Sequence, residues 1–486
     1  VQLSSFCAVQ VVSFIQTDDA YSFIEANIES ILEFCGCEEQ LVRIAAFSVL
    51  RSSIENKPSI LCKPENFDSV LQIIRFGLES DHQTAQVSLY AFRSLCEQSS
   101  YLNDGELLAI NFGSIIEMLF NSQERPDAFD DEFFEEVYDR IFIFIQKLPK
   151  VKECQEQLIE LFKKIFDHFA QLSSSTSSPS AIEERQKSGD LIIIIGIVQV
   201  LEDLILPFGN TLISTLIQEL LGTETAANSF NCNDAHKIIL TISQIIQYIG
   251  QEAAPFLDQL VTIAERGQLS NSPVEVNSSA NLIGSIVGKM GSHLISLGDD
   301  GASIVQRLFQ LVFNNFVKVE TLQSTIPHLL FAMADIIKGV ADQNPDYAQQ
   351  FVPPIMEALS GFVKDLNYYV KMDFDAAISI ADSLMNLFTI IIYAFPLETE
   401  FISENLEHVF IQVPIVVWDN KMLTKMTVEY FLSLMLCLIK ISGRRENYIL
   451  NNQKLREFLN FASSDESPYI DLKPTARHVR KFYSDI

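Results

Sequence analysis

The chain has 486 residues, 48% of them hydrophobic, and carries 63 Asp and Glu against 34 Lys and Arg, a formal net charge of −29. So much apolar material excludes a disordered polypeptide. Such an acidic surface repels nucleic-acid phosphates and anionic lipid headgroups, so we expect basic protein partners, no nucleic acid and no membrane insertion. The alternative is that the acidity only keeps a long apolar protein soluble.

Apolar residues recur at helical spacing along the chain, which predicts helices arranged in pairs. The stretch 67–99 shows the pattern most clearly. Phe67, Val70 and Ile74 mark one amphipathic helix, and a second helix follows a tight turn at Ser80–Asp81–His82. One hairpin of this kind buries both of its faces only when another hairpin packs on each side, which is how a solenoid is built.

The first half of the chain predicts four helix pairs after an opening segment. Residues 1–16 look like the last helix of an earlier repeat, and because the chain starts at Val1 we expect a fragment that lacks an N-terminal part. The pairs are 20–34 with 38–54, the two helices of 67–99, 106–121 with 129–148, and 151–172 with 190–206. Between the last two helices, residues 173–189 (SSSTSSPSAIEERQKSG) predict a polar, flexible loop.

The second half predicts six more pairs, which continue the same solenoid over residues 190–486 after the repeats of residues 1–172. Pro207 and Pro255 lie 48 residues apart and Pro354 lies 99 residues further on, as expected for helix starts in a HEAT-type repeat. Ser272–Glu275 predicts a capping box, and Ser467–Pro468 a cap and first turn. The pairs are 208–221 with 233–250, 255–266 with 273–294, 302–316 with 325–341, 354–364 with 370–395, 405–412 with 422–442, and 450–462 with 468–483.

Residues that carry chemistry are scattered. The seven histidines have no second His or Cys at ligand spacing, no phosphate-binding loop is present, and no Ser–His–Asp set can be proposed. The eight cysteines also complete no zinc pattern. We therefore predict a protein that is not an enzyme and that uses no cofactor and no metal.

The strongest functional signal is an acidic stripe on the helix expected over residues 129–148. Asp131, Glu135 and Asp139 recur at i, i+4 and i+8, and Glu132 and Glu136 flank them. Like charges at this spacing destabilise an isolated helix by about 0.2–0.5 kcal/mol per pair, which a basic ligand would offset. A solvated face near a helix N-terminus is an equally good interpretation, because the helix dipole favours carboxylates there.

Further acids fall on the helices predicted to be second in each pair. In HEAT solenoids the second helices line the concave side, so these acids would extend an acidic strip suited to a long basic helix or tail. They are Glu202, Asp203, Asp234, Asp335, Asp342, Asp375 and Asp382.

Five stretches resemble the importin-β (karyopherin-β) nuclear transport receptors, specifically their C-terminal half, in the order in which that family has them. They are FNSQERPDAFDDEFFEEVYDRIFIFIQKLP, NDAHKIILTISQIIQYIGQEAAPFLDQL, SSANLIGSIVGKMGSHL, IPHLLFAMADIIKGVADQNPDYAQQFVPPI and KPTARHVRKF. The last departs from the family by having His478 where tryptophan is common. Residues 1–109 match only as generic HEAT pairs.

The resemblance implies a nuclear import receptor that moves between cytoplasm and nucleus through the nuclear pore. Its acidic concave face would hold a basic cargo signal or an importin-α-type adaptor, and its outer helices would hold phenylalanine-glycine repeats of nucleoporins, with Phe309 and Phe313 as candidate contacts. The GTPase Ran would release the cargo, but its main site is expected to be missing from this chain. The alternative is a static HEAT scaffold, such as a phosphatase regulatory or coat subunit.

Overall fold

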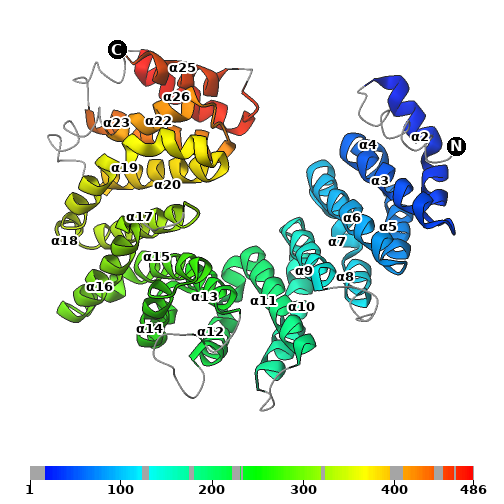
Figure 1. The fold of residues 1–486 in the computed structure, drawn as a ribbon, viewed down its shortest axis with the longest axis horizontal. Helices are drawn as coiled ribbons and strands as arrows, with labels where there is room; N and C mark the ends of the chain where they lie inside the picture. The colour runs from blue at the N-terminus through cyan, green and yellow to red at the C-terminus, as the bar shows by residue number, and fades with distance from the viewer. Residues whose placement is uncertain are drawn as a thin grey trace. The chain divides into compact units, whose positions relative to one another are not determined.

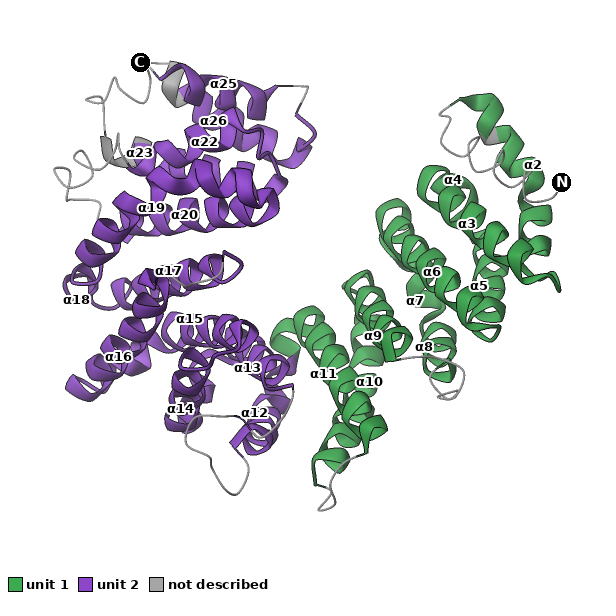
Figure 2. Cartoon of the chain, in the orientation of Figure 1, with its two compact units in different colours: residues 1–204 green, residues 205–486 purple. Residues whose placement is uncertain are grey.

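The chain is all α, as predicted: its computed structural model consists of helices, turns and loops, with no β-strand in the residues that it describes (Figure 1). Those residues are 17–122, 131–174, 180–221, 230, 234–318, 323–394, 409–442, 452–464 and 467–484. The predicted helix 1–16 and the first half of the predicted helix 405–412 lie outside them. The chain divides into two compact units, unit 1 (residues 1–204) and unit 2 (residues 205–486), which Figure 2 shows in green and purple.

Unit 1 contains the first four predicted pairs. Its helices are α2 (Asp18–Cys35), α3 (Gln40–Asn56), α4 (Pro58–Leu61), α5 (Pro64–Leu78), α6 (His82–Asn103), α7 (Glu106–Ile110), α8 (Phe112–Asn121), α9 (Asp131–Gln146), α10 (Lys152–Ser174) and α11 (Ala181–Leu201), followed by the 3-10 turn η1 (Glu202–Ile205). The second helices α3, α6, α9 and α11 pack on one another in chain order, and α2, α5, α8 and α10 each pack against their own partner. We call the former the second-helix row of unit 1.

Unit 2 repeats the arrangement. Its elements are α12 (Leu206–Leu221), α13 (Ala235–Ile249), η2 (Gly250–Phe256), α14 (Leu257–Gln268), α15 (Pro273–Ser296), α16 (Asp299–Val317), α17 (Ile326–Ala341), α18 (Pro345–Gln349), α19 (Val352–Met372), α20 (Phe374–Ala394), α22 (Gln412–Asp419), α23 (Lys425–Ser442), α25 (Gln453–Ser463), η5 (Ile470–Leu472) and α26 (Lys473–Ser484). The second-helix row of unit 2 is α13, α15, α17, α20, α23 and α26, each packed on the next.

Small residues set how closely neighbouring helices approach. A Cβ on Gly77 of α5 would overlap the hydroxyl of Ser88 on α6, so only glycine fits there. Between α15 and α17 the backbones themselves touch, because a Cβ on Gly291 would overlap the carbonyl of Gly339, and one on Gly339 would overlap the carbonyl of Val287. The glycines of this helix pair therefore serve packing rather than ligand binding.

Several predicted boundaries were wrong for local reasons. Helix α11 begins at Ala181, so the second half of the predicted loop 173–189 is helical, and Ser180 and Glu183 form a complete capping box there. At Ser272, the predicted capping box is absent because the side chain makes no capping hydrogen bond. Pro255 lies inside the 3-10 turn η2 and not at the start of α14. Helix α26 begins at Lys473, five residues after the predicted start at Pro468.

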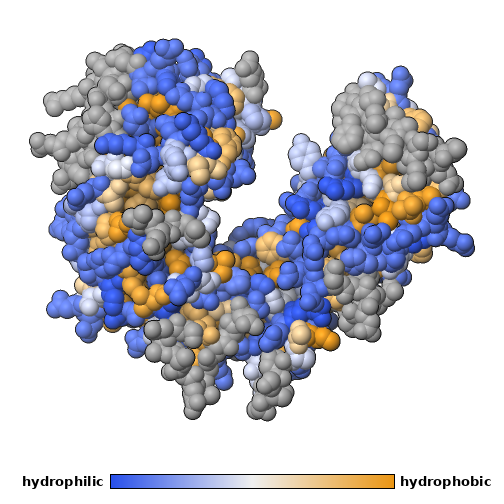
Figure 3. Space-filling model, in the orientation of Figure 1, coloured by the Kyte–Doolittle hydropathy of each residue, from blue (hydrophilic) through white to orange (hydrophobic). Residues whose placement is uncertain are grey.

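Two helical stretches are long and apolar enough to cross a membrane by length and composition alone. They are Ala181–Leu221 and Phe374–Ala394, in which 50% and 61% of the most apolar window is buried inside the protein. The buried residues of both stretches pack against neighbouring helices, as core helices of a solenoid do. Figure 3 shows that the face in view is mostly hydrophilic, with scattered apolar patches.

Candidate protein-binding faces

The acidic stripe lies on the exposed side of α9. Phe133 and Val137 are buried on the opposite side, whereas Asp131, Glu135 and Asp139 are exposed. Helix α9 belongs to the second-helix row of unit 1, as predicted, and packs between α6 and α11. The local sequence therefore places a row of carboxylates on the free side of a helix that is firmly anchored on its other side.

An arginine on α11, the next member of the second-helix row, pairs with the first carboxylate of the stripe. The Arg185 Nη1 atom, at the start of α11, lies 2.5 Å from the Asp131 Oδ1 atom. The same guanidinium lies 4.3 Å from the ring centroid of Phe134. This intramolecular ion pair relieves part of the repulsion for which the sequence suggested a basic ligand.

A buried arginine compensates the far end of the stripe. The side chain of Arg140 is only 4% exposed, and its guanidinium lies 3.6 Å from the Glu136 carboxylate and 3.5 Å from that of Asp139. It also lies 5.7 Å from the ring centroid of Tyr90 on α6. Burial, followed by a hydrogen bond with Glu136, raises the pKa of the Tyr90 hydroxyl. The two ends of the stripe are thus tied into the protein.

The centre of the stripe is different. Glu132 and Glu135 are exposed, and neither makes an ion pair with a residue that the structure describes. These two carboxylates, together with the exposed side of Asp139, are the charges that a basic partner could reach.

A cavity of about 290 Å³ lies close by, between α3 and α6. The Arg51 guanidinium lies 5.6 Å from the Tyr90 ring centroid and 2.8 Å from the Glu55 carboxylate, which also accepts a hydrogen bond of 2.8 Å from the Ser94 hydroxyl. The lining residues are Phe47, Ser48, Arg51, Ser52, Glu55, Val87 and Tyr90. The lining combines aromatic and aliphatic side chains with hydroxyls and charges of both signs, which suits an amphipathic side chain rather than a bare ion.

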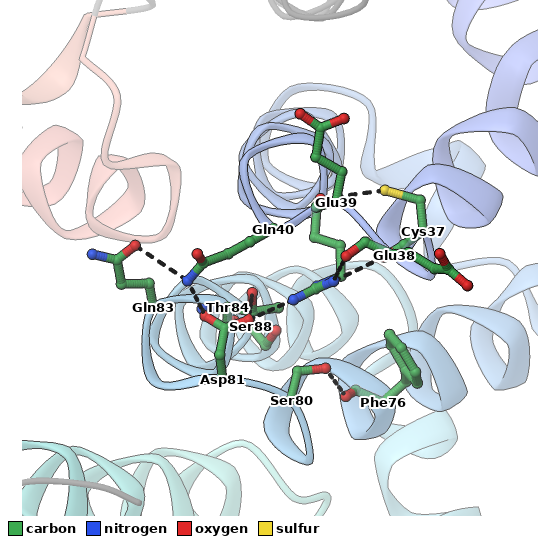
Figure 4. Close-up of polar contacts among 11 residues, drawn as sticks. Cys37, Glu38, Glu39, Gln40, Phe76, Ser80, Asp81, Gln83, Thr84 and Ser88 are labelled. Atoms are coloured by element: carbon green, nitrogen blue, oxygen red, sulfur yellow. Dashed lines mark hydrogen bonds and ion pairs between the residues drawn. The ribbon is translucent and has the colours of Figure 1, made fainter.

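The turn that joins α5 to α6 is fixed by Asp81 (Figure 4). The Asp81 carboxylate accepts hydrogen bonds from the Thr84 backbone N–H at 3.1 Å, from the Thr84 hydroxyl at 2.7 Å and from the Gln40 amide at 2.5 Å. The Arg43 guanidinium lies 2.6 Å from the same carboxylate and also donates to the carbonyls of Cys37 and Glu38. Asp81 therefore caps α6 and connects it to the previous pair.

These contacts control the ionisation of Asp81. Its partial burial alone would raise its pKa, but the hydrogen bonds from Thr84, Arg43 and Gln40 outweigh that effect and hold the pKa well below its ordinary value. The residue is ionised throughout the neutral range, and its role is structural.

The remaining predicted acids lie in different local settings. Glu202 and Asp203 lie in the 3-10 turn η1 and not on a helix, because α11 ends at Leu201, and Glu202 is paired with Lys150 at 2.5 Å. Asp234 lies just before α13 and is paired with Lys237 at 3.2 Å. Asp342 follows the end of α17, and Asp375 lies exposed in the first turn of α20.

Asp335 and Asp382 face inward in unit 2. Asp382 is 5% exposed, and its Oδ1 atom is buried with no hydrogen-bond partner. Asp335 is half-buried against Gly284 of α15. Burial raises the pKa of each carboxyl to about 6, with Lys338 and Lys289 opposing the rise at Asp335 and a Thr427 hydrogen bond opposing it at Asp382. Asp382 cannot meet a partner without a change in the packing of α20.

The predicted nucleoporin contacts lie on α16, a first helix. Phe309 is 3% exposed, and its ring centroid lies 4.7 Å from that of Phe351. Phe313 is half-buried, and its ring stacks on that of Phe309 at 5.6 Å. Of the two, only Phe313 presents surface to a peptide in this structure.

Sequence reasoning missed the residues that neutralise the stripe. Arg185 lies 54 residues from its partner Asp131, inside the segment predicted to be a loop. The sequence does predict a partner for Arg140, because it follows Glu136 at i+4, the spacing of a helical ion pair. Among the described residues, no group of three or more His, Cys, Asp or Glu could hold a metal ion.

A sequence profile described as "importin subunit beta-1-like, TPR repeats" matches residues 69–439. The chain belongs to the importin-β family. This confirms the resemblance drawn from the sequence. No curated protein sequence matches the chain.

Solved structures of importin-β proteins share the fold of this family member. A crystal structure of importin-β grown in ammonium sulfate matches with a TM-score of 0.77 and 14% identity over 99% of this chain and 55% of that chain. Yeast importin-β (Kap95p) matches with a TM-score of 0.75 and 12% identity over 96% and 53%. A complex of Kap95 with Nup1 matches with a TM-score of 0.73 and 12% identity over 96% and 52%. The chain thus spans about half the length of these importin-β chains.

Proposed function

We propose that this chain acts as a nuclear import receptor. The observation that carries the proposal is the family match over residues 69–439, which covers most of both units. On this proposal the second-helix row of unit 1 binds a basic cargo signal or an importin-α-type adaptor, with Glu132, Glu135 and Asp139 as the reachable charges. No catalytic step is part of the function.

The first helices supply the surface for nucleoporins. On this proposal, phenylalanine-glycine repeats insert beside Phe313 of α16, which stacks on the buried Phe309, and Phe309 in turn packs against Phe351 in a tilted arrangement. That a yeast relative has been solved with Nup1 supports this choice of partner. The same relative, Kap95p, has also been studied with RanGDP, which supports Ran as a partner. On this proposal Ran governs release.

The test is a pull-down of the purified chain on immobilised phenylalanine-glycine repeats. We expect retention of the wild-type chain and weaker retention of the Phe313→Ser variant. Tyr393→Ser, which removes a 65% exposed aromatic side chain from the second helix α20, is the matched control and should be retained like the wild type. Equal retention of both variants would move the nucleoporin site away from α16.

A second arm addresses the function as a whole. A basic import-signal peptide should bind the chain, and Ran-GTP added to the wash should lower retention of the peptide if Ran governs release from this part of the protein. A chain that binds neither phenylalanine-glycine repeats nor basic peptides, but copurifies with folded subunits, would instead be a static HEAT scaffold.

A further inference from the structure

The lining of the cavity between α3 and α6 includes polar atoms that have no partner among the described residues. The Arg51 Nε atom and the Ser94 hydroxyl both donate to the Oε1 atom of Glu55, each at 2.8 Å. Within the part of the chain that the structure describes, nothing bonds the Oε2 atom of Glu55 or the two Nη atoms of Arg51. The lining therefore offers an incoming group one acceptor and a pair of donors.

Apolar surface makes up another part of the lining. Phe47 of α3 is fully buried, and Val87 and Tyr90 of α6 are half-buried. Helices on both sides of α6 hold the Tyr90 ring, because the guanidiniums of Arg51 on α3 and Arg140 on α9 lie 5.6 and 5.7 Å from its centroid. The ring is thus fixed in place before any ligand arrives, which lowers the entropy that binding would cost.

The size and the charges of the cavity limit what it can hold. Its volume of about 290 Å³ is at the lower end of the range of about 300–1,000 Å³ for ligand pockets, so it suits one side chain rather than a cofactor. A guanidinium or ammonium group would meet the like charge of Arg51, and a carboxylate would meet that of Glu55. The occupant should therefore be uncharged, able both to donate and to accept a hydrogen bond, and partly apolar.

We propose that this cavity binds the side chain of a tyrosine in a partner protein. The phenol ring packs against Phe47, Val87 and Tyr90. Its hydroxyl donates to the second oxygen of Glu55 and accepts from an Nη atom of Arg51. Glutamine also carries a donor and an acceptor but has no ring to cover the apolar lining, and phenylalanine has the ring but no hydroxyl. Tyrosine meets all three requirements.

The cavity lies near the acidic stripe. The Tyr90 hydroxyl shares a hydrogen bond with Glu136, which flanks the stripe on α9, and α6 packs between α3 and α9. Packed helix axes lie about 8–10 Å apart, which puts the cavity about 15 Å from the axis of α9, a distance that an extended chain covers in about four or five residues. The tyrosine should lie that far along the ligand from its basic cluster. This spacing rests on the proposed function, whereas the tyrosine site does not.

The first measurement tests the tyrosine site alone. N-acetyltyrosinamide is added to the full chain at concentrations on the order of millimolar, and saturation-transfer NMR follows its binding. We expect saturable binding, and N-acetylphenylalaninamide should bind about two- to tenfold more weakly because it lacks the hydroxyl. Val87→Phe places a larger side chain in the cavity and should abolish binding of both amides.

Two matched variants test the hydrogen bond. Glu55→Ala removes the acceptor and should abolish the preference for the tyrosine amide over the phenylalanine amide. Glu97→Ala should keep that preference, because Glu97 forms the same i,i+4 pair with Arg93 on α6, at 2.9 Å, but does not line the cavity. Circular dichroism checks that each variant folds, and Val87→Phe carries the test if Glu55→Ala does not.

The second measurement connects the site to the proposed function. A peptide with about four lysines, a spacer of about four Gly and Ser residues and a final tyrosine should bind at least about tenfold more tightly than the same peptide ending in alanine. Glu135→Lys combined with Asp139→Lys should weaken binding of both peptides and leave binding of the tyrosine amide unchanged.

The outcomes separate the two sites. The proposal is overturned if the tyrosine amide fails to bind, if the two amides bind equally, or if binding survives Val87→Phe. It is also overturned if Glu97→Ala abolishes the preference as fully as Glu55→Ala does. If the tyrosine amide binds and the lysine peptides do not, the tyrosine site stands and the basic-ligand site of the proposed function fails.

Discussion

Asp81 shows how one residue sets the geometry between two helix pairs. Its carboxylate caps α6 and holds Arg43 and Gln40 of α3 at the same time. An N-cap contributes about 1 kcal/mol, and a charge-assisted hydrogen bond about 1.5–3 kcal/mol. Asp81→Ala should therefore lower the free energy of unfolding of unit 1 by about 2–4 kcal/mol in denaturant titrations followed by circular dichroism. Asp68→Ala, at an exposed position of α5, should change it little.

The low pKa of Asp81 also fixes the direction of a pH effect. A group whose pKa is depressed in the folded protein stabilises it above the unfolded pKa, near 4, and loses that contribution as pH falls through the folded value. The difference in stability between wild type and Asp81→Ala should be full at pH 7 and shrink below about pH 4. A difference that stays constant down to pH 2 would mean that the ionised carboxylate is not the stabilising species.

Asp335 and Asp382 are expected to behave in the opposite way. Their pKa values are raised to about 6 in the folded protein, so their contribution to stability is fully present below about pH 4 and is lost as pH rises through 6. Replacing both by Asn should raise the thermal midpoint of unit 2 at pH 8 and leave it nearly unchanged at pH 4. The matched control replaces the exposed Asp299 and Asp300 by Asn, and an equal rise at pH 8 in that control would rule out a role for burial.

At the scale of one element, α9 combines an anchored apolar side with an acidic stripe that is only partly compensated. Glu135→Lys combined with Asp139→Lys should weaken binding of a basic peptide at least tenfold, because exposed charge pairs contribute about 0.2–1 kcal/mol each and reversal also adds repulsion. Glu156→Lys combined with Glu160→Lys repeats the i, i+4 reversal on exposed residues of the first helix α10.

Titration of the same peptide at low and high salt completes that measurement. A steep fall in affinity with salt is expected for a site that relies on charge. Equal affinity of the α9 and α10 variants, or an affinity that does not depend on salt, would leave α9 as a solvated face.

Helices were predictable where the apolar periodicity is strong. Helix ends were less predictable where more than one side chain could serve as the N-cap. Phe67, Val70 and Ile74 are all buried, and the turn at Asp81 forms as expected. The polar composition of residues 173–189 predicted a loop, but Ser180 and Glu183 form a capping box that starts α11 inside this segment. At Ser272, a capping sequence forms no cap, since its backbone N–H instead bonds to the Ser270 hydroxyl.

The candidate sites were less predictable than the fold, because they depend on contacts between distant residues. Asp131 could be identified as acidic and helical, but its pairing with Arg185 needs the packing of α11 on α9. Likewise Asp375 and Asp382 both lie on α20, but Asp375 is exposed in its first turn, whereas Asp382 is buried and hydrogen-bonds Thr427 of α23. Apolar periodicity predicts which side of a helix is buried, but not which residues of other helices pack against it.

At the scale of the whole molecule, each pair touches mainly the next, so unfolding should not be a single concerted event. The only tryptophan, Trp418, packs between Lys421 and Phe458 near the end of unit 2. Its fluorescence reports that end alone, whereas far-ultraviolet circular dichroism reports all helices. Urea titrations should therefore give different midpoints for the two signals, and coincident curves would show that the chain unfolds as one cooperative body.

The backbone contact between α15 and α17 has a mechanical consequence. A layer of side chains between two packed helices can change rotamers, which lets the helices slide past each other. Where Gly291 meets Gly339 there is no such layer, so the two helices behave as one stiff block. Under a pulling or bending load, unit 2 would deform mainly at the junctions on either side of this block, where side chains lie between the helices. Its compliance would therefore vary from one repeat to the next.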